Sequence, residues 1–266
     1  NQKVTWNGSG NAWEYTPSKF WPSGTNDKVS FFAYAPYAGS NGITLTSADA
    51  SNNPQVNFSL QSNQKDMIDL VVSDPMDGSN GTMDMTSASG TVDFKFLHPL
   101  TRVAMEAKTG TDISANTDTK VFITAVSLVH TSKLNSKGTL DMKALTWASN
   151  TSDYLASPYA LTAASSNGIL NLTAASFAGY TTSSIDISSG GTTATSLFPA
   201  NEYLFLLPVD NATGTAAAGD VQVKIEYDIV NKTSAATHTA SNVEKTVNLP
   251  AGVLKKGTAY KFTFTV

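Results

Sequence analysis

The side chains that most often carry out acid–base or metal chemistry are sparse in this chain. It has three histidines, His98, His130 and His238, and no cysteine. None of the histidines stands in an HxH or HExxH pattern, or beside a carboxylate at metal-ligand spacing, so the sequence predicts no metal site. His98 ends an apolar strand pattern, and we expect its ring nitrogens to bond nearby backbone groups.

The carboxylates do not form a recognisable catalytic motif either. The loop "DPMDGSNGTMD" carries Asp74, Asp77 and Asp84, but it lacks the alternating oxygen ligands and closing Glu of a calcium loop. A glycosidase pair could still meet in space, because such carboxyls need only lie about 5–9 Å apart. No GxSxG motif or glycine-rich phosphate loop is present. We predict a non-enzymatic protein without a cofactor, with a hydrolase accessory domain as the weaker rival.

Aromatic residues near the N-terminus are better candidates for binding. The stretch "WEYTPSKFWP" places Trp13, Tyr15, Phe20 and Trp21 within nine residues. If exposed, Trp13 and Trp21 could stack on sugar rings; if buried, the cluster would close the end of a β-sandwich. The apolar stretch "VSFFAYAP" that follows favours the buried interpretation.

Composition excludes several classes of partner. The 266 residues carry a net charge of -4, and only 14% of them are charged. The 17 Lys and Arg form no cluster that would follow a phosphate backbone, so we predict no nucleic-acid binding. No stretch of about 18 apolar residues could span a membrane. The chain opens on "NQKVTW" without an initiator Met, and we expect a leader to have been removed.

The hydrophobic pattern has a period of two almost throughout, which is typical of β-strands with one buried face. The clearest cases are "VQVKIEYDIV" (221–230) and "YKFTFTV" (260–266), where apolar and polar residues alternate strictly. Turn-forming Gly, Asn, Asp and Ser separate the strands, and a turn of helix could form at 160–165 or 172–178. The chain is therefore expected to be all-β, in two β-sandwiches. Further strands are predicted at 29–36, 55–60, 69–74, 120–130, 138–142, 168–173, 184–188 and 202–209.

The alternation changes phase within "FKFLHPLTRVAMEA" (94–107). Val92, Phe94, Phe96, His98 and Leu100 share one face, and the apolar set then moves to residues 103, 105 and 107. A strand that leaves one core for another must exchange its faces, and proline suits a lapse in pairing. We therefore predict domains at 1–98, lacking its first strand or strands, and 99–266. An ordinary β-bulge is the alternative.

Several stretches in their order along the chain resemble the fimbrillin-like (Mfa-like) proteins of Bacteroidia. They are "WEYTPSKFWP" with "VSFFAYAP", then "FKFLHPLTRVAMEA", then the closing "KKGTAYKFTFTV". The resemblance implies two tandem transthyretin-like β-sandwich domains with Greek-key type connections. It also implies a cell-surface or outer-membrane protein, attached to the membrane only through an N-terminal lipid anchor that is lost with the leader.

The same resemblance implies a structural subunit, or an accessory or tip adhesin, of surface fimbriae. Its partners would be other fimbrial subunits, and host or bacterial surface molecules are further candidates. Subunits of this kind join by β-strand addition, and inserting the last strand into a neighbour would bury its apolar face. The same strand could instead complete its own domain. The alternative function is a surface lipoprotein that binds carbohydrate through Trp13 and Trp21. The candidate polymerisation residues are Tyr260, Phe262, Phe264 and Val266.

Overall fold

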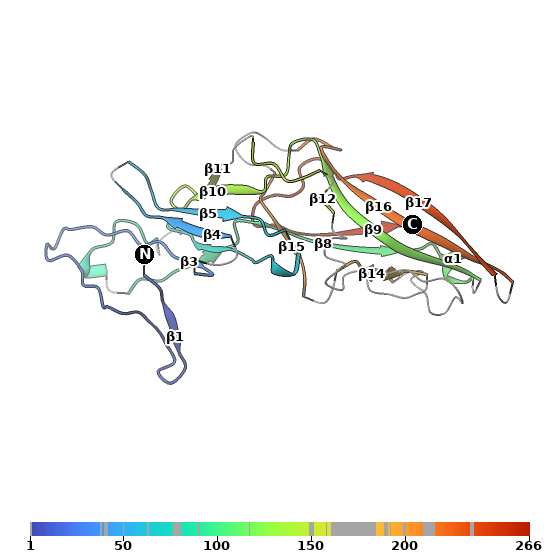
Figure 1. The fold of residues 1–266 in the computed structure, drawn as a ribbon. Helices are drawn as coiled ribbons and strands as arrows, with labels where there is room; N and C mark the ends of the chain where they lie inside the picture. The colour runs from blue at the N-terminus through green and yellow to red at the C-terminus, as the bar shows by residue number, and fades with distance from the viewer. Residues whose placement is uncertain are drawn as a thin grey trace. The chain divides into compact units, whose positions relative to one another are not determined.

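The chain is almost entirely β-structure, which confirms the predicted all-β class (Figure 1). The helical elements among the described residues are one short α-helix, α1 (Thr111–Ser114), and 3-10 turns at Gln64–Asp66 and Ser87–Ser89. The computed structural model describes residues 2–266 except 38, 40–41, 50, 63, 77–80, 90, 117, 149–151, 158, 161–184, 189–190, 192, 199–200, 210–215 and 235–236. The predicted strand at 168–173 and most of the two candidate helical turns lie outside these residues.

The chain folds into two compact units, each made of separate segments. Unit 1 comprises residues 1–59, 69–99 and 138–148, and unit 2 comprises 60–68, 100–137 and 149–266. Most of unit 1 therefore precedes residue 100 and most of unit 2 follows residue 99. The exceptions are residues 60–68, which belong to unit 2, and 138–148, which belong to unit 1. The division into domains at 1–98 and 99–266 stays a prediction. The compact units differ from it mainly in the assignment of 60–68 and 138–148.

Unit 1 contains three sheets. A two-stranded ribbon at its N-terminus pairs Trp6 with Trp13. A four-stranded sheet has the order β11-β10-β5-β4, and a three-stranded sheet has the order β3-β6-β7. The strands are β1 (Thr5–Asn7), β2 (Ala12–Glu14), β3 (Tyr34–Ala35), β4 (Ile43–Thr46), β5 (Gln55–Ser59), β6 (Val71–Ser73), β7 (Phe96–Leu97), β10 (Lys137–Asp141) and β11 (Thr146–Ala148).

The core of unit 1 forms where the alternating positions of these strands meet. In β5, Val56 and Phe58 are buried while their neighbours are partly exposed. The ring of Phe58 lies edge-on to that of Trp147, with ring centroids 6.2 Å apart. This spacing falls within the range of about 4.5–7 Å that is usual for aromatic pairs. The indole nitrogen of Trp147 donates a 2.8 Å hydrogen bond to the Pro99 carbonyl. Other buried apolar residues are Ile43, Leu70, Val72, Leu140 and Met142.

Unit 2 is built from two larger sheets. The five-stranded sheet has the order β12-β9-β16-β17, with β13 also paired to β9, and its long strands β9, β16 and β17 run side by side (Figure 1). In the second sheet β8 pairs with β14 and β15 on one edge and with β18 on the other. The strands are β8 (Thr101–Lys108), β9 (Thr119–His130), β12 (Tyr159–Ala160), β13 (Ile185–Asp186), β14 (Thr195–Ser196), β15 (Leu204–Leu206), β16 (Val221–Ser234), β17 (Thr237–Asn248) and β18 (Ala259–Thr265).

The inner faces of these two sheets share one apolar core. Strand β8 alternates buried and partly exposed residues along its whole length, as the sequence predicted. Its buried side chains pack in one cluster with those of β9, β15, β16 and β18. Two sheets that bury facing side chains in this way form a β-sandwich. Prominent members of the cluster are Val103, Met105, Ile123, Leu128, Leu204, Val223, Ile225 and Phe264.

A second change of phase lies inside β9. Glu226 of β16 is opposite Ala125, whereas the next residue, Tyr227, is opposite Ile123, so Thr124 is an extra residue in the ladder. A β-bulge of this kind exchanges the faces of a strand. Because of it, Ile123 and Val126 both point into the core of unit 2 although they are three residues apart.

The structure corrects the predicted face of residues 92–100. Phe94 and Phe96 are 39% and 47% exposed, and their rings lie 6.2 Å apart. Only Leu100 of that set is fully buried. Strand β7 ends at residue 97 and β8 begins at 101, so pairing does lapse around Pro99. Phe94 belongs to unit 1, and Met105 lies in the core of unit 2.

Candidate assembly and binding surfaces

The last strand of the chain, β18, lies in its own sandwich in this structure. It runs parallel to β8 over seven residue pairs, from Ala259 opposite Arg102 to Thr265 opposite Lys108. Phe264 is buried, and Tyr260, Phe262 and Val266 are partly buried against the same core. The four candidate polymerisation residues therefore share one face of an intramolecular strand, and their role between subunits stays a prediction.

Polar side chains on the outer face of the sheet hold β18 to β8. Lys261 Nζ lies 2.7 Å from Glu106 Oε2, and Thr263 Oγ1 donates a 2.7 Å hydrogen bond to Glu106 Oε1. The hydrogen bonds from Lys261 and Thr263 lower the pKa of Glu106 below its usual value, because they stabilise the ionised carboxylate. Glu106 thus links two residues of β18 to the central strand of the sheet.

The outer edge of β18 presents backbone groups that the ladder with β8 does not use. Arg102 N donates to Thr258 O, and Val266 N donates to Lys108 O. Even-numbered residues of β18 therefore face β8, and the odd-numbered residues, 259 to 265, direct their N–H and C=O groups to the other side. Among the described residues β8 is the single strand that pairs with β18.

Strand β17, at one edge of the other sheet, is differently built. Strand β17 pairs with β16 and ends the five-stranded sheet within the described part of the chain. Lys245 lies opposite Ile225, a core residue, so a charged side chain stands on the core-facing side of this edge strand. An inward-pointing charge discourages another strand from pairing at an edge, because pairing would bury it. The corresponding side chains of β18 are all uncharged.

The N-terminal aromatic residues are separated into two groups. Trp13 is 67% exposed and pairs with Trp6, whereas Trp21 is half-buried against Phe31, 5.3 Å between ring centroids. Phe20 is 91% exposed. The buried interpretation of the cluster is therefore wrong for Trp13, Tyr15 and Phe20. Glycan stacking by Trp13 and Trp21 stays a prediction, and the two rings have different neighbours.

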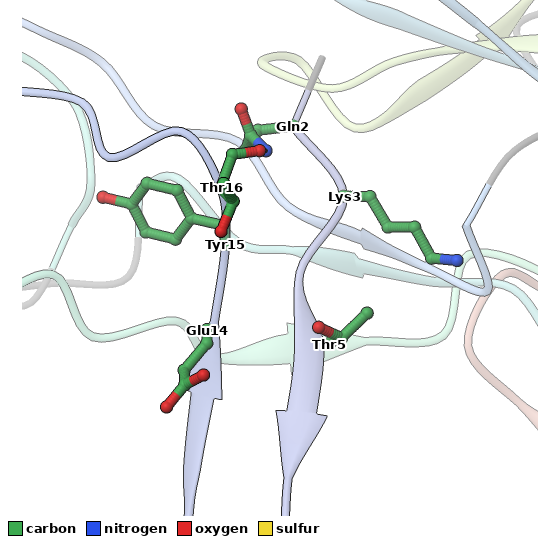
Figure 2. Close-up of a pocket in the computed structure, with 6 residues that line it drawn as sticks. All are labelled: Gln2, Lys3, Thr5, Glu14, Tyr15 and Thr16. Atoms are coloured by element: carbon green, nitrogen blue, oxygen red, sulfur yellow. The ribbon is translucent and has the colours of Figure 1, made fainter.

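A shallow hollow of about 280 Å³ lies at the open end of the N-terminal ribbon. Figure 2 shows Gln2 and Lys3 on the segment that leads into β1 with Thr5 at its start, and Tyr15 and Thr16 on the segment that follows Glu14 at the end of β2. The side chains of Lys3 and Tyr15 point away from each other (Figure 2). The hollow is open and its lining is mainly polar.

Two of the histidines have structural partners. His98 Nδ1 lies 2.8 Å from Asp69 Oδ2, so the predicted backbone partner for His98 is wrong. His130 is buried, its Nε2 lies 3.1 Å from the Leu155 carbonyl oxygen, and its Nδ1 accepts hydrogen bonds from the backbone N–H groups of Lys133 and Leu134. Burial lowers the pKa of His130, because a charged ring would lose its hydration. A ring held in this way orders the end of β9.

In the described part of the chain, no three metal-ligating side chains come together, so the carboxylates form no metal centre there.

Glu202 is partly buried, and loss of hydration raises the pKa of its carboxyl group, an effect that Lys65 opposes. No helix among the described residues has the length and apolar character to cross a bilayer.

Sequence reasoning overlooked two features of these surfaces. Val4 and Trp6 belong to the exposed aromatic ribbon, but the motif "WEYTPSKFWP" begins later in the chain. The strict alternation Val4, Trp6 and then Trp13, Tyr15, with a Gly-rich turn between them, was the available signal. Strand β17 was also missed, because its apolar residues are few and Lys245 interrupts them.

Comparison with known proteins gives consistent results over the full length. A family model described as fimbrillin-like matches residues 1–266. The fimbrium subunit Fim1C of Phocaeicola vulgatus is 36% identical over 278 aligned positions, covering 100% of this chain and 70% of that protein. The crystal structure of a fimbrial protein from Bacteroides vulgatus superposes with a TM-score of 0.82 at 35% identity, covering 100% of this chain and 80% of that one.

Proposed function

The chain belongs to the fimbrillin-like family, and from this premise we propose that it is a structural fimbrial subunit whose β18 edge accepts an extended strand of a neighbouring subunit. Membership places the protein in surface fimbriae, in assembly with other subunits. In this proposal β18 stays in its own sandwich and its odd-numbered residues pair with the incoming strand. The outer-membrane lipid anchor stays a prediction.

The observation that carries the proposal is the contrast between two edge strands of unit 2, β18 and β17. Strand β18 shows an uncharged inner face, and its outward-facing backbone groups pair with no other strand among the described residues, whereas β17 carries the inward-facing Lys245. Strand addition uses backbone hydrogen bonds for affinity and side-chain pockets for specificity. Of these two edges, β18 is the one at which a new strand would meet no misplaced charge.

Backbone hydrogen bonds and ring burial would both stabilise a strand added at β18. Four outward-facing residues of β18 offer backbone groups, and each hydrogen bond made there contributes about 0.5–1.5 kcal/mol. Tyr260 and Phe262 are stacked, with ring centroids 5.9 Å apart, and remain partly exposed. A strand laid beside them would cover these rings and add hydrophobic stabilisation of roughly 25 cal/mol per Å².

Proline substitution tests the edge directly. Thr265→Pro removes an outward-facing N–H of β18 and leaves the ladder with β8 intact, because proline is tolerated on the free side of an edge strand. Thr246→Pro is the matched control on β17: Leu249 N donates to Val221 O, so by alternation the N–H of residue 246 also points outward. Assembly is measured as filaments by electron microscopy and as oligomers resistant to detergent.

We expect Thr265→Pro to abolish assembly and Thr246→Pro to leave it unchanged, with both variants unfolding at temperatures close to that of the parent. Equal assembly by the Thr265→Pro variant would contradict the proposal.

A disulfide distinguishes an accepting edge from a donated strand. The chain contains no cysteine, and Lys108 and Thr265 are register partners in the β8–β18 ladder. A Lys108→Cys, Thr265→Cys variant would lock β18 to its own sheet when oxidised. Assembly of the oxidised protein supports an accepting edge. Assembly that occurs only after reduction would instead show that β18 leaves its sandwich to pair with a neighbour.

A non-catalytic role agrees with the side chains that could do chemistry. His98 is engaged by Asp69, and His130 by three backbone groups. The described carboxylates form no metal-binding group. These contacts give His98 and His130 structural partners, which supports a non-catalytic role.

A further inference from the structure

The N-terminal ribbon is amphipathic, and its apolar face is exposed. Val4, Trp6, Trp13 and Tyr15 occupy alternate positions on the two chain segments, and we call these four residues the ribbon face. Their exposed fractions are 45%, 51%, 67% and 44%. Ribbon strands β1 and β2 form a separate two-stranded sheet. Large apolar patches left open on a stable protein usually mark a binding site.

The two indole rings define the centre of the ribbon face. Trp6 and Trp13 lie directly opposite each other in the register, with ring centroids 5.5 Å apart and planes inclined at 63°. An edge-to-face pair of this kind stabilises the ribbon and fixes both rings. The turn between the strands is also ordered, because Asn7 Oδ1 accepts hydrogen bonds from the backbone of Ser9 and Gly10. The rings are therefore presented on a defined support.

The opposite face of the ribbon is polar and has its own contacts. Asn7 Nδ2 donates a 2.8 Å hydrogen bond to Glu14 Oε1, which ties the two strands together. Lys3 Nζ lies 5.8 Å from the centre of the Tyr37 ring, within reach of a cation–π contact. The charged side chains of the ribbon thus lie on the polar face, and the ribbon face itself carries no charge.

The size of the ribbon face decides between kinds of occupant. Each of the three aromatic side chains has about 200 Å² of surface, and the Val has somewhat less. Multiplying these areas by the exposed fractions gives roughly 350–400 Å² of apolar surface in contact with solvent. A stable protein–protein interface needs about 800 Å² from each partner, twice that area. An oligosaccharide of two or three rings needs no more than the area available. The absence of charge on the ribbon face also argues against an anionic lipid surface or a charged peptide.

We propose that the ribbon face binds a neutral carbohydrate, through β-linked pyranose rings whose hydroxyl groups are equatorial. Such rings have flat C–H faces that can lie on Trp13 and Tyr15. Their hydroxyl groups reach donors at the rims of the same side chains, the indole N–H groups and the Tyr15 hydroxyl. The second tryptophan of this surface is Trp6, whereas the sequence suggested Trp21. The inference gives the fimbrial subunit an adhesive surface and does not depend on assembly at β18.

Titration of the monomeric protein with cellohexaose and with chitohexaose tests the proposal, followed by tryptophan fluorescence and calorimetry. An α-linked mannohexaose, whose axial hydroxyl breaks the flat face, is the carbohydrate control. We expect binding of a β-linked hexaose that weakens at least about tenfold in Trp13→Ala, as for a stacked ring at the centre of a contact. Phe20→Ala, which removes an aromatic ring exposed outside the ribbon face, should bind as the parent does.

Two further variants separate loss of the ligand contact from loss of the ribbon. Trp13→Phe keeps an aromatic ring and should retain most of the affinity, and Tyr15→Ala leaves the Trp6–Trp13 pair in place and should weaken binding. Undiminished binding by Trp13→Ala, or no binding of either β-linked hexaose, would overturn the proposal. Self-association of the parent that Trp13→Ala abolishes would also overturn it, because the ribbon face would then be a protein interface. Filament formation is measured separately, so failure here leaves the β18 proposal standing.

Discussion

The imidazole of His130 lies between the Leu155 carbonyl oxygen, 3.1 Å from Nε2, and the backbone N–H of Lys133, 3.2 Å from Nδ1. Only the neutral tautomer with its proton on Nε2 satisfies both contacts, because Nδ1 must accept. The end of β9 is therefore coupled to the protonation state of one buried ring.

Acidification should destabilise unit 2 through His130. Its pKa is lowered in the folded protein, so the unfolded chain binds the proton more tightly. The stability that neutral His130 provides is present above the unfolded pKa of about 6.5 and is lost as the pH falls below that value. Urea unfolding at pH 7.5, 6.5 and 5.5 should show this decrease. A His130→Gln variant keeps the other two histidines and should show a smaller one; an equal decrease would assign the effect elsewhere.

Removing the indole N–H of Trp147 should weaken unit 1. Trp147 is buried and its Nε1 donates to the Pro99 carbonyl at 2.8 Å. Trp147→Phe leaves that buried acceptor without its donor, at a cost of about 1–3 kcal/mol in the free energy of unfolding. Trp13→Phe is the matched control at an exposed site and should change stability by less than about 0.5 kcal/mol. Chemical denaturation of both variants provides the measurement, and equal effects would contradict the role of the hydrogen bond.

Truncating Phe264 should destabilise the sandwich of unit 2. Phe264 is the most buried side chain of β18 and packs in the shared core. Phe264→Ala leaves a cavity and should cost about 3–5 kcal/mol. Phe20→Ala, at a 91% exposed position, should cost little. Thermal unfolding compares them, and a small effect at Phe264 would mean that β18 contributes little to the folded monomer.

Neutralising Glu106 should loosen β18 in a pH-dependent way. The carboxylate accepts from Thr263 and pairs with Lys261, and these bonds lower its pKa. Its contribution is present above the unfolded pKa of about 4.3 and disappears as the pH falls through the lowered folded value. Glu106→Gln should therefore reduce stability by about 1 kcal/mol or less at pH 7, and by less at pH 3. Hydrogen exchange of the β18 amides is the readout, and Glu244→Gln on β17 is the control.

Much of the fold could be predicted from alternation alone. The predicted strands 55–60, 120–130, 138–142 and 260–266 correspond to β5, β9, β10 and β18 within about one residue. Strands β5, β10 and β18 alternate strictly or nearly so. Strand β9 instead has runs of consecutive buried residues, such as Val121, Phe122 and Ile123. The predicted strand 29–36 is reduced to β3, Tyr34–Ala35, with an isolated bridge at Val29. Its apolar run has no clear alternation, so composition alone overstated its length.

The candidate binding residues were harder to assign, because exposure depends on which face is covered. Trp13 and Trp21 are close in sequence, yet one is exposed in a ribbon and the other packs on Phe31. The change of phase at Pro99 and the one at Thr124 look alike in sequence. The first lies where β7 ends and β8 begins, and the second is a bulge within a single strand and a single core.

The sequence by itself determined the all-β class, the positions of the most regular strands and the face of each that is apolar. These properties follow from the two-residue period of a strand, which is local. Only the tertiary structure decided which strands lie at the edges of sheets, that Lys245 stands on the core-facing side of one edge, and that Trp6 and Trp13 face solvent together. Such properties depend on partners distant along the chain, because pairing and burial are set by neighbours in space.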